Sequence, residues 1–208
     1  MKKENLKTLT KLADFSQKNL TIDQLESGLP RWLIETGFAF MLLAAICILH
    51  PIEQYTYKHS PVIYSLINCI GIVIMYYAMM KGMKRQIKPM SKLWIAIIVL
   101  NIAGSVATSI PSITYTIGLA ISMSLSLFYL PLGVSIMYIY RGLLQKIGFV
   151  MVVRIVLLMI LPIIAFCISK ITSNESIMSS MVIIIDAIIF VVELIYSWML
   201  RKILIKTD

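Results

Sequence analysis

The stretch from Ile177 to Leu200, IMSSMVIIIDAIIFVVELIYSWML, decides the fold class of this chain. It is long enough to cross a bilayer, which takes roughly 20 apolar residues rising about 1.5 Å each. Two acids interrupt it, Asp186 and Glu193, and their spacing puts both on one face of a helix. A charged side chain in hydrocarbon costs about 2.5–3.5 kcal/mol even on lenient insertion scales. The stretch therefore predicts a transmembrane helix whose acids face other helices or water.

The composition of the whole chain extends this prediction. Of the 208 residues, 59% are hydrophobic and 14% are charged, and the mean hydropathy is +0.88. Soluble domains average about 45–50% apolar residues. We therefore expect an all-α, polytopic transmembrane helix bundle without a separate soluble domain. A net charge of +9 would suggest nucleic acid in a soluble protein, but here the positions of the charges explain it. No direct nucleic-acid partner is expected.

Six apolar segments are long enough to serve as spans. They cover residues 32–49, 61–83, 93–110, 116–140, 147–169 and 177–200, and they make up a membrane domain of residues 31–208. Of the 19 Lys and Arg residues, all but Lys58, Lys170 and Arg154 lie on one side of this arrangement. The positive-inside rule then predicts that both chain ends are cytosolic. The turn between the third and fourth spans is short, so one re-entrant unit is the alternative there.

Residues 1–30 form a polar segment that precedes the first span. Leu6, Leu9 and Leu20 lie close to one helical stripe with lysines opposite, which is typical of a helix on a membrane surface. Thr21 and Gln24 match a capping box, and Leu20 and Leu25 are spaced as a hydrophobic staple around it. This pattern predicts a second short helix from about residue 22 to residue 28. Both features favour a segment that folds on, or binds, a cytosolic protein.

A basic loop follows the second span and offers another cytosolic contact surface. Lys84, Arg85 and Lys88 lie in it, and an acidic partner would match their charge. The fourth span carries Gly118, Ser122 and Ser126 at four-residue spacing. Small residues let helix backbones approach closely, so tight packing or homo-oligomerisation is the expected use. A polar conduit along this face is the alternative.

Arg154 in the fifth span and Glu193 in the sixth lie at equal depth from the cytosolic end. Each is about seven residues inside its span, roughly 10 Å at 1.5 Å per residue. Neighbouring antiparallel helices would bring the two charges together, and each would then neutralise a charge that is costly in hydrocarbon. The alternative is that the Arg154 side chain extends along its span to the headgroups.

Asp186 lies near the expected midplane of the bilayer, at the level of Asn68 in the second span. Asn101 is another polar residue inside a span. An intramembrane acid indicates ion, proton or signal coupling by default. The alternative is a neutral, hydrogen-bonded acid that fixes the register of its helix.

The chemistry of enzymes is not indicated. The sequence has no phosphate-binding loop, zinc-protease helix, nucleophile elbow or dinucleotide turn. His50, Glu53 and His59 share one loop, but their irregular spacing does not match a metal site. We therefore expect no enzyme activity, no metal and no cofactor.

Two functions remain. The first is a non-enzymatic membrane anchor or sensor that recruits a soluble cytosolic partner, self-associates, or does both. The second is a small secondary transporter or ion channel that uses Asp186 with Arg154 and Glu193. The capped N-terminal segment favours the first, and a composition rich in Ile and Lys fits a bacterial cytoplasmic membrane.

Overall fold

The computed structural model describes residues 20–47, 49, 61–86, 91–109, 129–171 and 175–205. These residues are almost entirely helical, which confirms the all-α class. The departures among them are two short strands, the segments beside them, and the single residues Leu49 and Ile205. The helices are α2 (Arg31–Cys47), α4 (Pro61–Gln86), α5 (Ser91–Ser109), Tyr129–Ile139, α7 (Leu143–Ile171) and α8 (Glu175–Leu204).

The labelled helices correspond to five of the six expected spans. Their ends agree with the expected boundaries to within four residues. The helix Tyr129–Ile139 covers the end of the expected fourth span, and residues 116–128 lie outside the described part of the chain. Each of these five expected segments therefore forms a helix in the structure.

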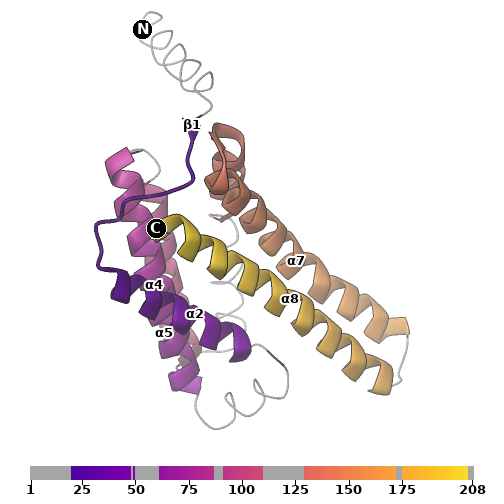
Figure 1. The fold of residues 1–208 in the computed structure, drawn as a ribbon. Helices are drawn as coiled ribbons and strands as arrows, with labels where there is room; N and C mark the ends of the chain where they lie inside the picture. Colours follow the sequence, from indigo (N-terminus) through magenta and orange to yellow (C-terminus); the bar gives the residue numbers. More distant parts are fainter. Residues whose placement is uncertain are drawn as a thin grey trace, which may run out of the picture.

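The helices pack as two groups that meet at one end (Figure 1). In one group α4 packs against both α2 and α5; in the other, α7 and α8 lie side by side as a hairpin. Helix α2 also contacts α8, which joins the groups. Away from this junction the α7–α8 hairpin extends as an arm.

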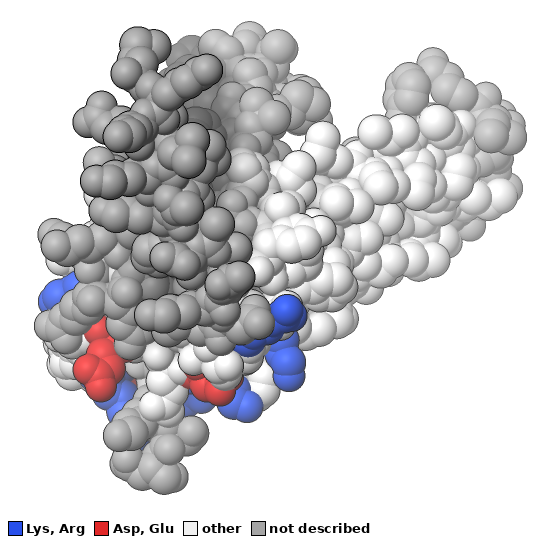
Figure 2. Space-filling view, turned by 90° about the horizontal axis from the view of Figure 1, so that it is seen from above, with Lys and Arg blue, Asp and Glu red and all other residues white. Residues whose placement is uncertain are grey.

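Three of the described helices are long and apolar enough to cross a membrane. The apolar segments are Leu66–Met83, Leu143–Leu161 and Ser179–Leu204. On the α7–α8 arm many large apolar side chains are exposed: Met159, Ile160, Ile163, Ile183, Ile184, Ile188 and Val191. Figure 2, seen from above, shows no charged residue on that face of the arm, whereas the charged residues visible in this view gather near the junction. Such a surface fits lipid and not water.

The buried core lies at the junction end of the bundle. Its fully buried side chains come from the last turns of α4 and α8, from the first turns of α5 and α7, and from the helix Tyr129–Ile139. They include Tyr76, Met79, Met83, Trp94, Ile97, Leu144, Ile147, Tyr196, Leu200 and Ile203. The contacts that hold the bundle together are therefore concentrated where these helix ends meet.

The chain before α2 is extended and built into this end; we call residues 20–29 the N-terminal strap. Strand β1 (Leu20–Thr21) pairs in parallel with β2 (Tyr140–Arg141), which precedes α7. The Ile22 N–H donates to the Arg141 carbonyl at 3.1 Å, and the Leu144 N–H donates to the Ile22 carbonyl at 3.0 Å. The strap thereby continues the strand pairing into the first turn of α7.

The helix expected from about residue 22 to residue 28 is wrong. Thr21 lies in β1, and Gln24 lies in extended chain with its side chain exposed. Leu25 is 2% exposed, packed into the core of this chain, so it offers no surface to a partner. The physical reason is that the strap's backbone groups find partners in other elements, and these bonds replace those of an isolated two-turn helix, which is marginal alone.

Asp23 caps α7 from a distance in sequence. The Leu143 N–H donates to its Oδ1 at 2.8 Å, which satisfies one of the N–H groups that a helix start leaves open. Gly142 precedes this helix with a φ of 76°, a backbone conformation that favours glycine. A Cβ at this position would also lie 3.0 Å from the Thr21 methyl group. Gly142 therefore allows the strap and the start of α7 to lie this close.

Candidate functional site

Arg154 of α7 and Glu193 of α8 form an ion pair inside the bundle. The Arg154 Nε donates to Glu193 Oε1, and the two side chains are only 17% and 10% exposed. The contact confirms the pairing expected from equal depth and argues against Arg154 extending alone to the headgroups. Because each charge neutralises the other, the pair avoids the cost of an isolated charge in an apolar setting.

Tyrosine rings surround the guanidinium group. Its carbon lies 5.3 Å from the ring centroid of Tyr196 and 5.6 Å from that of Tyr129, which places the cation in cation–π range of both rings. Tyr76 contacts both tyrosines in edge-on geometry, at 6.0 and 6.5 Å between centroids. Trp94 packs edge-on against Tyr76 at 5.0 Å. We call Tyr76, Tyr129 and Tyr196 the tyrosine cage.

Asn101 of α5 belongs to the wall of this cage. Its amide nitrogen lies 3.0 Å from the Tyr129 hydroxyl and donates to the Ile97 carbonyl at 2.8 Å. Because Asn101 ties Tyr129 to α5, its observed contacts orient an aromatic ring that faces Arg154. Asn101 and Arg154 are thus linked through one tyrosine.

A cavity of about 240 Å³ lies beside the ion pair, between α2, α4, α7 and α8. Among the described residues that line it, the polar ones are Arg154, Glu193 and Asn68. The other described lining residues are apolar: Met41, Ala44, Ala45, Ile72, Leu158 and Ile189. A mostly apolar cavity with a few convergent polar groups is typical of a site for a small molecule.

The wall formed by α2 and α4 depends on a close helix contact. A Cβ on Gly71 would lie 2.8 Å from the Met41 backbone nitrogen, and one on Gly37 would lie 2.6 Å from Ile74 Cγ2. Both distances are shorter than real Cβ contacts, so these two glycines let the helices approach. Sequence reasoning missed them because it sought small residues at regular spacing.

Asp186 does not line this cavity. It lies on α8 two turns before Glu193, with its side chain half-buried. The structure therefore brings together Arg154, Glu193 and Asn68 from the expected polar set, and it leaves Asp186 apart from them. Asn101 contacts the tyrosine cage through the Tyr129 hydroxyl.

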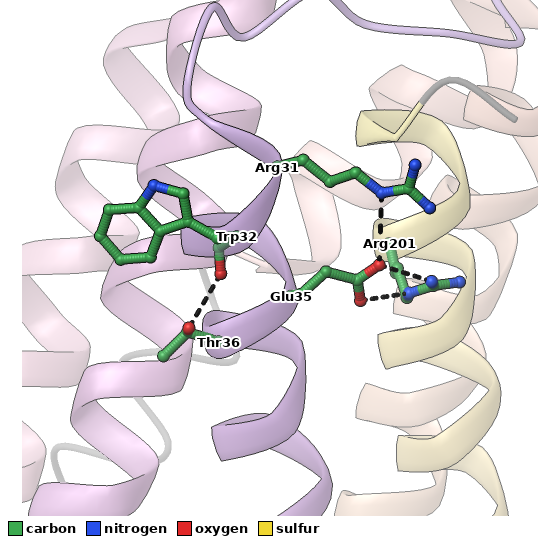
Figure 3. Close-up of polar contacts among 5 residues, drawn as sticks. All are labelled: Arg31, Trp32, Glu35, Thr36 and Arg201. Atoms are coloured by element: carbon green, nitrogen blue, oxygen red, sulfur yellow. Dashed lines mark hydrogen bonds and ion pairs between the residues drawn. The ribbon is translucent and has the colours of Figure 1, made fainter. Parts of the chain in front are cut away.

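A second ion pair lies near the junction end (Figure 3). Arg201 of α8 donates to both carboxylate oxygens of Glu35 of α2, at 2.7 and 2.6 Å. Arg31 approaches the same carboxylate at 3.9 Å, and the Trp32 ring points away from it. The Glu35 carboxylate thereby joins α2 to α8. Both residues lie near the cytosolic ends of expected spans, and that shared depth could have indicated the pair.

The remaining expected site residues lie outside what the structure describes. Leu6, Leu9 and Lys88 lie in segments that it does not cover, as do Gly118, Ser122 and Ser126. The helix α4 includes Lys84 and Arg85, and the chain path includes Leu20, but the side chains of these three are not described. Their expected roles in partner binding and helix packing stay predictions.

The tyrosine cage was missed by sequence reasoning, although one signal was present. Tyr196 follows Glu193 by three residues, so the two share a helical face. Tyr76 and Tyr129 come from different helices, and no local pattern joins them.

No family model, curated protein or solved structure matches this chain.

Proposed function

We propose that this chain is a non-enzymatic membrane anchor or sensor that recruits a soluble protein through its first 19 residues. In this proposal it has six spans in a bacterial cytoplasmic membrane, with both ends in the cytosol. The distribution of Lys and Arg supports that orientation. At the junction end Trp32 and Tyr138 are 68% and 75% exposed, and Lys202 lies 5.0 Å from the Trp198 ring, as in an interfacial belt of aromatic and basic residues.

One observation carries the proposal: the N-terminal strap is part of the folded bundle. Its backbone is bonded to β2, to the start of α7 and, through Leu25, to the end of α8. Residues 1–19 are therefore joined to the bundle at a fixed point, Leu20. A change in how α7 and α8 pack would alter the position of that point, which is what a sensor with a cytosolic output requires.

The test is co-purification of a soluble partner with the full-length chain and with a deletion variant that keeps the strap. Tagged full-length chain and a variant lacking residues 1–19 are solubilised gently from their native cells, and co-purifying proteins are weighed by mass spectrometry. We expect a soluble protein in fixed ratio with the full chain and its loss with the deletion. The strap is intact in both, so insertion and folding should be equal. A bare oligomer or bare monomer with the full chain would contradict the proposal.

Matched substitutions sharpen the same experiment. Leu6→Ala with Leu9→Ala changes the expected apolar stripe, whereas Lys7→Ala with Lys11→Ala changes its basic side. Loss of the partner with the leucine pair alone would indicate an apolar contact. Loss with the lysine pair alone would indicate an acidic partner surface or anionic lipid.

The cavity favours a second candidate, a small transporter or channel. Arg154, Glu193 and Asn68 meet in a space between four helices, which is an arrangement that could hold a transported molecule. The full-length chain reconstituted into vesicles should then carry a molecule or an ion across the bilayer. The substitution Glu193→Gln or Asp186→Asn should abolish this flux. Deletion of residues 1–19 should leave that flux unchanged, which separates the two functions.

A further inference from the structure

We infer that the cavity between α2, α4, α7 and α8 binds a small zwitterion that carries a primary ammonium group and an oxyanion beside an apolar group. This deepens the sensor proposal above by assigning the class of molecule sensed. The inference comes from the size of the cavity, the charges of its described lining residues, and the donor and acceptor groups of its ion pair.

The size limits the ligand. About 240 Å³ is below the range of roughly 300–1,000 Å³ that holds drug-sized molecules. The apolar side chains of Met41, Ile72 and Leu158 line the cavity, so an apolar group of a few carbon atoms would lie against them. A large ligand would not fit in this volume, and a wholly polar ligand would leave the apolar lining without an apolar contact.

The charge limits the ligand further. Among the residues that the structure describes, the charged ones that line the cavity are Arg154 and Glu193, and their formal charges sum to zero. A ligand with a net charge would add an uncompensated charge to a poorly solvated space, which is costly. A zwitterion adds none. Its dipole can lie antiparallel to that of the ion pair, so that each of its charges faces an opposite one.

The ion pair has donor and acceptor groups of the kinds that such a ligand requires. Contact between the two side chains runs through the Arg154 Nε and one carboxylate oxygen of Glu193. Arginine has five N–H donors in a planar fork suited to an oxyanion, and a carboxylate can accept from an ammonium on its second oxygen. The Asn68 amide supplies a further donor and acceptor at the cavity wall.

Two sources share this chemistry: a soluble apolar amino acid, or the ethanolamine phospholipid headgroup of the surrounding bilayer. The experiment uses purified full chain in phosphatidylcholine nanodiscs. Thermal stability is followed with L-leucine, with N-acetyl-L-leucine as the anionic analogue and with L-leucine methyl ester as the cationic one. A second arm measures by native mass spectrometry whether phosphatidylethanolamine is retained in preference to phosphatidylglycerol.

Two substitutions and a control link binding to the cavity. Ala45→Leu fills the space, and Asn68→Leu removes a polar group at nearly constant volume. Ala39→Leu adds the same bulk on the exposed face of α2. We expect either L-leucine or phosphatidylethanolamine to bind the wild type and Ala39→Leu, with affinity about tenfold or more lower in the two cavity variants.

Three results would overturn the inference. The first is equal binding of the net-charged analogues or of phosphatidylglycerol. The second is the absence of binding by both zwitterions, and the third is binding that is unaltered in Ala45→Leu and in Asn68→Leu. Partner capture depends on residues 1–19, whereas ligand binding is tested at cavity residues of α2 and α4, so failure of one test leaves the other result readable.

Discussion

The backbone N–H of Leu25 donates a 2.7 Å hydrogen bond to the carbonyl oxygen of Ile203, in the last turn of α8. That carbonyl is one of the groups that a helix end leaves without an intrahelical partner. The Leu25 side chain meanwhile packs beside Gly82 of α4, where a Cβ would lie 3.0 Å from the Leu25 Cβ. One strap residue therefore caps α8 and contributes to the core at the same time.

Shortening the Leu25 side chain should destabilise the junction end of the bundle. Leu25→Ala removes buried apolar atoms and leaves a cavity, which costs about 2–5 kcal/mol in protein cores. Unfolding in mixed micelles measures the change in free energy. The control is Glu26→Ala, because Glu26 is exposed beside it. Equal stability of the two variants would mean that the strap does not contribute to folding.

Removing the cap from α7 should have a smaller and more local effect. Asp23→Ala loses the acceptor for the Leu143 N–H, and loss of such a cap costs about 1 kcal/mol. Hydrogen exchange at the first amides of α7 should become faster, whereas amides in the middle of α7 should be unchanged. Asp23→Asn keeps an acceptor oxygen and should restore most of the protection; exchange as fast as in Asp23→Ala would contradict the capping role.

Removing one charge of the Arg154–Glu193 pair should destabilise the protein more than removing both. Arg154→Met alone leaves the buried Glu193 carboxylate without its partner, and Glu193→Leu alone does the same to the Arg154 guanidinium; each change costs about 3–5 kcal/mol. The double variant Arg154→Met with Glu193→Leu removes both charges and should be more stable than either single variant. Unfolding in mixed micelles measures all three. Additive losses in the double variant would show that the two charges do not stabilise one another.

The Glu35–Arg201 pair should contribute less, because both side chains are about one third exposed. A double-mutant cycle with Glu35→Gln and Arg201→Gln should give a coupling free energy of about 0.2–1 kcal/mol. Added salt should reduce it, since solvent-exposed charges are screened. Arg31→Gln is the control: at 3.9 Å and 67% exposed, its coupling to Glu35 should be smaller still. A larger coupling for Arg31 would contradict the bidentate geometry.

Gly71→Ala should separate α2 from α4. The added methyl group would meet the backbone of Met41, which cannot move aside as a side chain can. Overpacking of this kind costs about 1–3 kcal/mol. Because the same contact forms one wall of the cavity, ligand binding should weaken along with stability. Leu66→Ala, on the exposed face of α4, should have little effect on either.

Hydropathy alone determined the all-α class of this protein and, to within four residues, the ends of its five labelled helices. A long apolar run must satisfy its backbone polar groups internally, so it forms a helix whatever its neighbours are. Equal depth also predicted the Arg154–Glu193 pair, since antiparallel neighbours meet at equal depth. These inferences needed only periodicity, length and the cost of a charge in hydrocarbon.

Tertiary structure decided the rest. The strap is extended because Ile22 and Leu25 bond to Arg141, Leu144 and Ile203, which no local pattern relates to them. The tyrosine cage joins three helices around Arg154. Asp186 does not line the cavity, although its spacing from Glu193 puts both acids on one face of α8. Helical periodicity specifies which residues share a face, but only the packing of whole helices determines which faces meet.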